Sequence, residues 1–132
     1  MATDAWPWPH FRRAELQCRC GCGQCLIQPA FMQRLEQLRG VFGLPMSVSS
    51  GYRCPTHNAA VSTTGPHGPH TTGRAVDVLM YGAAALDLLD AALRLGFVGI
   101  GVQQKGPHAG RFLHLDDLQD GPGQPRPFLW TY

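Results

Sequence analysis

The chain has 132 residues and a formal net charge of +2, and 44% of its residues are hydrophobic while 15% are charged. This length and balance are typical of one globular domain with a modest core. So mild a positive charge gives no support for nucleic-acid binding, and no segment approaches the roughly 20 apolar residues that cross a bilayer.

The first part of the chain, residues 1–17, is expected to form an N-terminal arm ahead of a single domain over residues 18–132. Trp6 and Trp8 alternate with prolines in this arm, and we expect them to pack on the domain or on a partner. The start of the chain has neither the charged region nor the apolar region of a secretion signal.

Four of the five cysteines fall close together in CRCGCGQC, and Cys54 stands apart. Thiolates at short range can hold a structural zinc ion tetrahedrally, although the usual signature is two separated CxxC pairs. Three alternatives stay open: a structural metal bound by Cys18, Cys20, Cys22 and Cys25, a disulfide that involves Cys54, and free thiols. A redox protein is disfavoured, because redox CxxC motifs belong to a βαβ pattern that this chain lacks.

Two segments have the apolar spacing of amphipathic helices. The first covers residues 29–39, with a proline in its first turn and Gly40 expected at its end. The second covers residues 83–95 and is expected to end at Gly96. The residues expected to face the core are Phe31, Leu35 and Leu38 in the first helix and Leu86, Leu89 and Leu93 in the second.

Short segments with strand-like patterns surround the second helix. We expect strands within residues 45–51, 75–80, 97–102 and 111–117, the last two paired through the glycine-rich loop 105–110. A tail of turn and loop precedes the apolar FLWTY at the end of the chain. Helices combined with a small, mostly antiparallel sheet predict an α+β fold.

Two of these strands are expected to carry polar side chains into one cleft. In AVDVLM, Asp77 points away from the side that Val76 and Val78 bury in a core. In RFLHLDD, His114 and Asp116 share one strand face with each other.

These strand positions and one turn together predict a catalytic zinc site. Such a site takes three ligands from His, Asp and Glu and keeps a fourth position for water or substrate. His70, Asp77 and His114 would complete that set, with a tight turn at Gly73 between the first two. Because the chain has six histidines, spacing alone leaves a chance pairing open.

From Ser50 onward the chain reads SGYRCPTHNAAV, then HTTGRAVDV, GIGV and FLHLDD. This order resembles the zinc-dependent D-alanyl-D-alanine carboxypeptidase family, which has relatives among phage endolysins and shares its fold with the hedgehog signalling domain. The motifs that carry the resemblance are SxHxxGxAxD, met at His70, Gly73, Ala75 and Asp77, and HxD, met at His114 and Asp116. The resemblance extends from about Phe11 to Trp130.

The resemblance implies roles for individual residues. His70, Asp77 and His114 would bind zinc, and Arg53 of the SGYR motif would contact the substrate or stabilise the developing oxyanion. The chain departs from the family pattern twice. Gly68 replaces the serine two residues before the first ligand, and Arg111 replaces the acidic or histidine base three residues before the last one.

The general base therefore has to come from elsewhere in the chain. Asp116 is the first candidate, because it shares a strand face with His114, and its alternative role is to orient a ligand histidine. His108 is the second candidate, on a loop that could fold over the cleft, and its alternative is a solvated loop residue.

Together these features predict a zinc-dependent peptidase that hydrolyses peptidoglycan stem peptides, as a D-Ala-D-Ala carboxypeptidase or an endopeptidase. We expect a monomer with a peptide substrate, no nucleic-acid partner and no membrane span. Without a secretion signal, the protein would stay in the cytoplasm until lysis or travel on a virion, and would act at the bacterial cell wall as a phage or prophage product. The alternative is a non-catalytic zinc-binding module of the same fold, for which Arg111 in place of a base would be typical.

Overall fold

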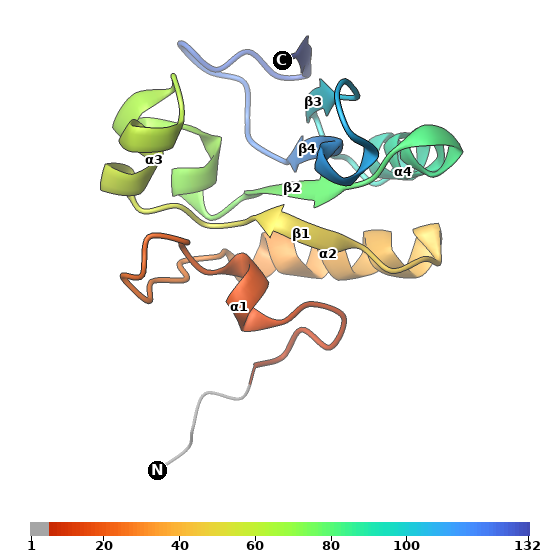
Figure 1. Cartoon of the computed structure of the whole chain (residues 1–132), viewed down its shortest axis with the longest axis horizontal. Coiled ribbons are helices and arrows are strands. Elements are labelled where there is room, and N and C mark those ends of the chain that lie inside the picture. Colours follow the sequence, from red (N-terminus) through yellow and green to blue (C-terminus); the bar gives the residue numbers. More distant parts are fainter. Residues whose placement is uncertain (1–5) are drawn as a thin grey trace.

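The computed structural model describes residues 6–132 and has an α+β fold, as the sequence predicted (Figure 1). Within these residues five strands form one sheet in the order β1-β2-β4-β3-β5. The β1–β2, β2–β4 and β4–β3 pairs are antiparallel, and β5 joins β3 in parallel. The strands are β1 (Ser47–Ser50), β2 (Ala75–Leu79), β3 (Gly99–Gln103), β4 (Phe112–Asp116) and β5 (Phe128–Thr131).

Helices cover one face of this sheet. Helices α2 and α4 pack against each other and α4 also contacts β4; Figure 1 shows α2 behind β1 and α4 at the right of the sheet. Helix α3 and two short 3-10 turns, η1 and η2, form a separate group between β1 and β2 in the chain. The helical elements are α1 (Arg13–Leu16), α2 (Pro29–Phe42), α3 (Pro55–Val61), η1 (Gly65–His67), η2 (Pro69–Thr72), α4 (Gly82–Arg94) and η3 (His108–Gly110).

The main core lies between the sheet and the two long helices. Strand alternation directs Val76 and Val78 of β2 and Leu113 and Leu115 of β4 into it, and each of these side chains is at most 1% exposed. Burial of one such side chain contributes about 1.5–3 kcal/mol to folding. The opposite face of the same strands is therefore free to carry polar groups.

The N-terminal segment contributes to this core. Phe11 is 2% exposed and Leu16 is fully buried, while Trp6 and Trp8 pack against the core from its edge. The indole N–H of Trp6 donates a hydrogen bond to the carbonyl of Phe11. The described part of the expected arm thus lies on the domain, whereas residues 1–5 fall outside the described part of the chain.

Two details of the long helices differ from the sequence-based expectation. Helix α2 continues through Gly40 to Phe42, and Gly43, with a φ of 80°, provides the left-handed C-cap that glycine adopts most readily. In α4 the predicted leucine stripe is wrong at Leu86 and Leu93, which are 69% and 55% exposed, whereas Leu89 is partly buried and packs against the core. The helix instead buries a face rich in small residues, formed by Ala85, Leu88, Ala91 and Ala92. A pattern search weighted by hydrophobicity misses such a face, because alanine contributes little to it.

Candidate metal centre and catalytic site

The polar face of the sheet aligns several site residues in one row. Asp77 of β2 pairs with His114 of β4, which pairs with Gly101 of β3, which in turn pairs with Trp130 of β5. His70 reaches the same place from η2, just before the turn at Gly73. The fold therefore brings together the three ligands expected from the sequence.

The three side chains have the geometry of a zinc site. His70 Nε2 lies 3.3 Å from Asp77 Oδ1, and His114 Nδ1 lies 3.1 Å from the same oxygen. Ligand atoms about 2.0–2.1 Å from a tetrahedral zinc ion are separated by about 3.3 Å, so these distances match the edges of such a site. The three residues are only 2–6% exposed. Their donor set and spacing fit zinc.

Each histidine ring is oriented through its other nitrogen. His70 Nδ1 donates to the carbonyl of Gly51 at 2.7 Å, and His114 Nε2 donates to Asp116 Oδ2 at 2.7 Å. These contacts leave Nε2 of His70 and Nδ1 of His114 as the acceptor nitrogens that face Asp77. Metal-binding histidines are commonly held in this way.

Protonation of the site follows from this arrangement. Burial acts to raise the pKa of Asp77, but the charges and hydrogen bonds of His70 and His114 bring it well below its usual range. Burial acts in the opposite sense on His114, whose pKa is nevertheless raised by hydrogen bonds to Asp116 and Asp77. Asp77 is thus ionised at neutral pH, the form in which a carboxylate binds metal.

Asp116 is completely buried and does not line the cavity described below. Arg126 donates from Nε to Oδ1 at 2.9 Å and from Nη2 to Oδ2 at 2.8 Å, while His114 donates to Oδ2. Burial would raise the pKa of Asp116, but these two partners lower it to about 2. This placement favours the alternative left open by the sequence, in which Asp116 orients the ring of His114.

Arg126 was not recognised in the sequence, where it stands in the loop PGQPRP with no pattern to distinguish it. The fold places its guanidinium against Asp116 and 5.4 Å from the ring centre of Trp130. It balances a carboxylate that would otherwise be costly to bury.

Two glycines of β3 make room for these side chains. A Cβ at Gly99 would lie 2.1 Å from Asp116 Oδ1, and a Cβ at Gly101 would lie 2.7 Å from Trp130 Nε1 and 2.9 Å from the Cβ of His114. The indole of Trp130 can therefore approach the His114 ring, with 4.8 Å between ring centres. Glycine inside a strand is a sequence signal for such close approach, and GIGV carries it twice.

Arg53 follows β1 and reaches the metal centre. Its Nε donates to Ser50 Oγ at 3.0 Å, Nη1 donates to Asn58 Oδ1 at 3.1 Å, and Nη2 lies 3.5 Å from Asp77 Oδ2. Asn58 is fully buried and is itself held by the hydroxyl of Thr64 at 2.8 Å. Arg53 is thus a fixed cation beside the ligand carboxylate.

The packing around Gly68 explains why this chain has glycine where the family pattern has serine. A Cβ at this position would lie 2.0 Å from Thr64 Oγ1 and 2.8 Å from Asn58 Nδ2. The Thr64 side chain therefore fills the space that a serine at position 68 would need, and it supports Asn58 and, through it, Arg53.

A cavity of about 700 Å³ opens above the three ligands. Phe112, Phe128 and Trp130 form apolar walls, and the polar lining includes Arg53, His67, Tyr132, His70, Asp77 and His114. Burial and the charge of Asp77 raise the pKa of Tyr132 to about 12. Its hydroxyl is thus protonated at neutral pH and can donate a hydrogen bond into the cavity.

His108 lies away from this cavity. It is exposed in η3, stacks on Tyr81 with 4.5 Å between ring centres, and faces a separate hollow beside Met80. Arg111 likewise does not line the cavity, since its Nε donates to the carbonyl of Gly106. The structure therefore does not bring His108 together with the expected zinc ligands.

A second group of metal-binding side chains lies near the start of α3. The sulfur atoms of Cys18, Cys20, Cys22 and Cys54 are all within 4.8 Å of one another. Cys25, expected from the sequence as the fourth member, is outside this group and packs against the main core. Cys54 takes the place expected for Cys25, because the fold brings Cys54 to this loop although it is distant in sequence. All five cysteines are free thiols, so the structure contains no disulfide with Cys54.

Comparisons with known proteins agree with the motifs. A family model described as Peptidase M15 matches residues 9–116, which include all three expected ligands and Arg53. A search of curated proteins found no match. None of the helices within residues 6–132 is long and apolar enough to cross a membrane. Arg126, Trp130 and Tyr132 lie beyond the matched segment, although they complete one side of the site.

Proposed function

Because this chain belongs to the Peptidase M15 family, a family of zinc metallopeptidases, we propose that it hydrolyses peptide bonds in the stem peptides of peptidoglycan. The observation that carries this proposal is the position of the His70, Asp77 and His114 cluster, which lines a cavity together with the fixed cation Arg53. Both carboxypeptidase action on a terminal D-Ala-D-Ala and endopeptidase action within the stem are compatible with a cavity of this kind.

When bound, zinc supplies a Lewis acid that polarises the scissile carbonyl and lowers the pKa of a water molecule. The protein contributes the three ligands and keeps them oriented. The Gly51 carbonyl holds the ring of His70, and the Asp116 carboxylate holds that of His114. Ligands that are already oriented need little rearrangement during the reaction. This preorganisation provides much of the catalytic advantage of such sites.

Arg53 is suited to bind negative charge on the substrate. Contacts with Ser50 and Asn58 fix its guanidinium, whose N–H groups can donate to a developing oxyanion or to the terminal carboxylate of a stem peptide. Removing one such donor typically lowers the rate by about 10²–10³-fold.

We assign proton transfer to His67, the imidazole that lines the cavity without belonging to the ligand set. Imidazoles exchange protons readily near neutral pH. Tyr132 can donate a hydrogen bond to the substrate but, with its raised pKa, is not suited to accept a proton. His67 is preferred to Asp116 and His108, because neither of those lines the cavity.

The aromatic walls suit small apolar side chains such as those of alanine. Phe112, Phe128 and Trp130 line the cavity together with polar residues of η1 and η2. We propose that the protein acts at the bacterial cell wall, because its proposed substrate is found there. It would reach the wall after release by lysis or on a virion.

The proposal is tested by incubating the metal-loaded protein with purified peptidoglycan fragments and analysing the products by mass spectrometry. Loss of terminal D-Ala would identify a carboxypeptidase, and new amino termini within the stem an endopeptidase. Arg53→Ala is expected to lower the rate by about 10²–10³-fold. Arg94→Ala is its matched control, since the Arg94 side chain is 75% exposed and far from the ligands in sequence. Absence of products from every wall type, despite bound metal, would refute the peptidase proposal for this substrate.

A second candidate function is a non-catalytic zinc module that binds the cell wall. One observation favours it. Among the described residues that line the cavity, Asp77 has the only carboxylate side chain, and because it is an expected zinc ligand it is not free to act as the general base. In that case the metal-loaded protein would sediment with insoluble peptidoglycan and release no fragments, and His67→Ala would bind as well as the parent protein.

A further inference from the structure

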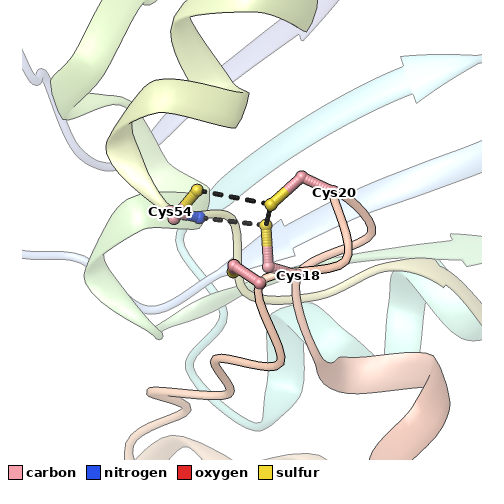
Figure 2. A group of neighbouring side chains, drawn as sticks. Cys18, Cys20 and Cys54 are labelled. Carbon is pink, nitrogen blue, oxygen red and sulfur yellow. Dashed lines mark hydrogen bonds between the residues drawn. The ribbon is translucent and has the colours of Figure 1, made fainter.

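Four thiols from two distant segments converge beside the catalytic site. Cys18, Cys20 and Cys22 belong to the loop after α1, while Cys54 directly precedes α3. Figure 2 shows Cys18 and Cys20 pointing from their loop toward Cys54, joined to it by dashed contacts. No role in the proposed reaction accounts for this group.

The sulfur separations match a metal centre better than a disulfide. Cys18 Sγ lies 3.4 Å from Cys20 Sγ, which lies 3.7 Å from Cys54 Sγ. Zinc–sulfur bonds of about 2.3 Å in a tetrahedron separate the sulfur atoms by about 3.8 Å, whereas a disulfide requires about 2.05 Å. Four soft sulfur ligands in this arrangement favour zinc among the common divalent metals.

Backbone N–H groups point at two of the sulfur atoms. The amide of Cys54 donates to Cys18 Sγ at 3.3 Å, and the amide of His57 donates to Cys54 Sγ at 3.4 Å. Such contacts stabilise the thiolate form that binds metal.

The loop that carries three of the ligands has little else to hold its shape. Residues 19–24 are exposed and form no helix or strand. Gly21 and Gly23, with φ of 90° and 76°, turn the chain sharply between successive cysteines. Apolar burial therefore does not explain why the sulfur atoms of Cys20 and Cys22, both exposed, converge on Cys54.

We propose that Cys18, Cys20, Cys22 and Cys54 bind a structural zinc ion that links the N-terminal loop to the turn carrying Arg53. Cys54 is the residue directly after Arg53, and the Arg53 amide donates to the His70 carbonyl at 3.2 Å. A metal at the cysteines would thus restrain the backbone from which Arg53 reaches the catalytic centre. This site does not depend on the proposed peptidase activity.

Thiol reactivity in the unmodified protein gives the first test. Because Cys20 and Cys22 are exposed, burial cannot protect them from a thiol reagent such as dithionitrobenzoate, and bound metal can. We expect Cys20 and Cys22 to resist the reagent in the zinc-loaded protein and to react rapidly after chelation. Cys25, which packs against the core and whose thiol pKa is raised by burial, should react slowly in both states. Rapid reaction of Cys20 and Cys22 before chelation, or a mass decrease that reveals a disulfide within the cluster, would overturn the proposal.

Metal content of matched variants gives the second test. The parent protein is expected to hold two zinc ions per chain, and Cys22→Ser and His70→Ala one each. Cys25→Ser, which alters a cysteine outside the cluster, should retain both. After cobalt substitution, the intense near-ultraviolet sulfur-to-metal absorption should persist in His70→Ala and vanish in Cys22→Ser. Loss of this absorption in Cys25→Ser, or its absence from the parent protein, would contradict the assignment.

The link to Arg53 is tested by hydrogen exchange in the folded Cys22→Ser protein. Amides in residues 51–58 should exchange faster than in Cys25→Ser, because the metal no longer restrains this segment. If Cys22→Ser loses the metal and exchange there is unchanged, the metal does not restrain the Arg53 turn. No peptidase product is needed for these measurements, and thiol reactivity, sulfur-to-metal absorption and exchange near Arg53 report on the cysteine site alone, so their outcome is separable from that of the proposed function.

Discussion

The two groups of metal-binding side chains in this protein are built in different ways. His70, Asp77 and His114 are buried; Asp77 and His114 lie on paired strands whose other face is the hydrophobic core, and His70 joins them from η2. Cys18, Cys20, Cys22 and Cys54 lie on a loop and a helix start, and two of them are exposed. The first group is arranged by the packing of the sheet, whereas the second needs a ligand to explain its arrangement.

This difference separates two uses of metal. A site whose ligands are already oriented by core packing can keep an open coordination position for chemistry. A site with four protein ligands has no open position and contributes to folding instead. The two sites are connected through the chain, because Arg53 reaches the catalytic centre and the next residue, Cys54, belongs to the cysteine cluster.

The largest expected effect comes from removing a ligand of the buried group. His70→Ala should reduce the release of peptidoglycan fragments to the level of a protein-free blank, because two ligands do not hold a catalytic zinc ion in place. Product analysis, together with zinc content, measures this. Full activity in His70→Ala would mean that the buried group is not the reaction centre.

Adding a side chain within the row of site residues on β3 should lower the stability of the sheet. Gly101→Ala places a Cβ against Trp130 and His114, and we expect unfolding free energy to fall by about 1–3 kcal/mol. Gly40→Ala is the matched control, since a Cβ there meets no atom within 4 Å and alanine favours a helix by up to about 1 kcal/mol. Urea unfolding of both variants gives the comparison; equal stability of the two would argue against this packing.

Weakening the support of a ligand should have an intermediate effect. Asp116→Asn removes the charge that Arg126 balances and weakens the acceptor for His114. We expect affinity for the catalytic zinc to fall by about 10–100-fold, measured by competition with a chelating dye. Asp90→Asn, an exposed carboxylate on α4, should change nothing. An unaltered affinity in Asp116→Asn would leave Asp116 without a positioning role.

The smallest effect is expected when all metal is removed from the unmodified protein. Amide exchange in β2 and β4 should stay within about twofold of the metal-loaded protein, because core packing protects these strands. Exchange in the loop over residues 18–25 should accelerate. Uniform loss of protection across strands and loop would show that the two regions are not organised differently after all.

Periodic patterns of apolar residues in the sequence predicted most of the fold, because the same residues pack in the core. Alternation in AVDVLM and FLHLDD predicted which faces of β2 and β4 are buried, and it placed Asp77 and His114 on the other side. The pattern failed in α4, where close packing selects alanines over the exposed Leu86 and Leu93. It also failed at the end of α2, because Gly40 is tolerated within the helix while Gly43 provides the left-handed turn.

The sequence by itself determined the family and the identity of the three expected zinc ligands, because these depend on residue types at short, regular spacings. Only the tertiary structure decided which residues surround them. It joined Asp116 to Arg126, separated His108 from the cavity, brought His67 and Tyr132 into it, and replaced Cys25 by Cys54 in the cysteine cluster. These contacts depend on how the loops fold back onto the sheet, and no periodic pattern in the sequence records them, whether the residues are ten positions apart, as Asp116 and Arg126 are, or more than thirty, as Cys20 and Cys54 are.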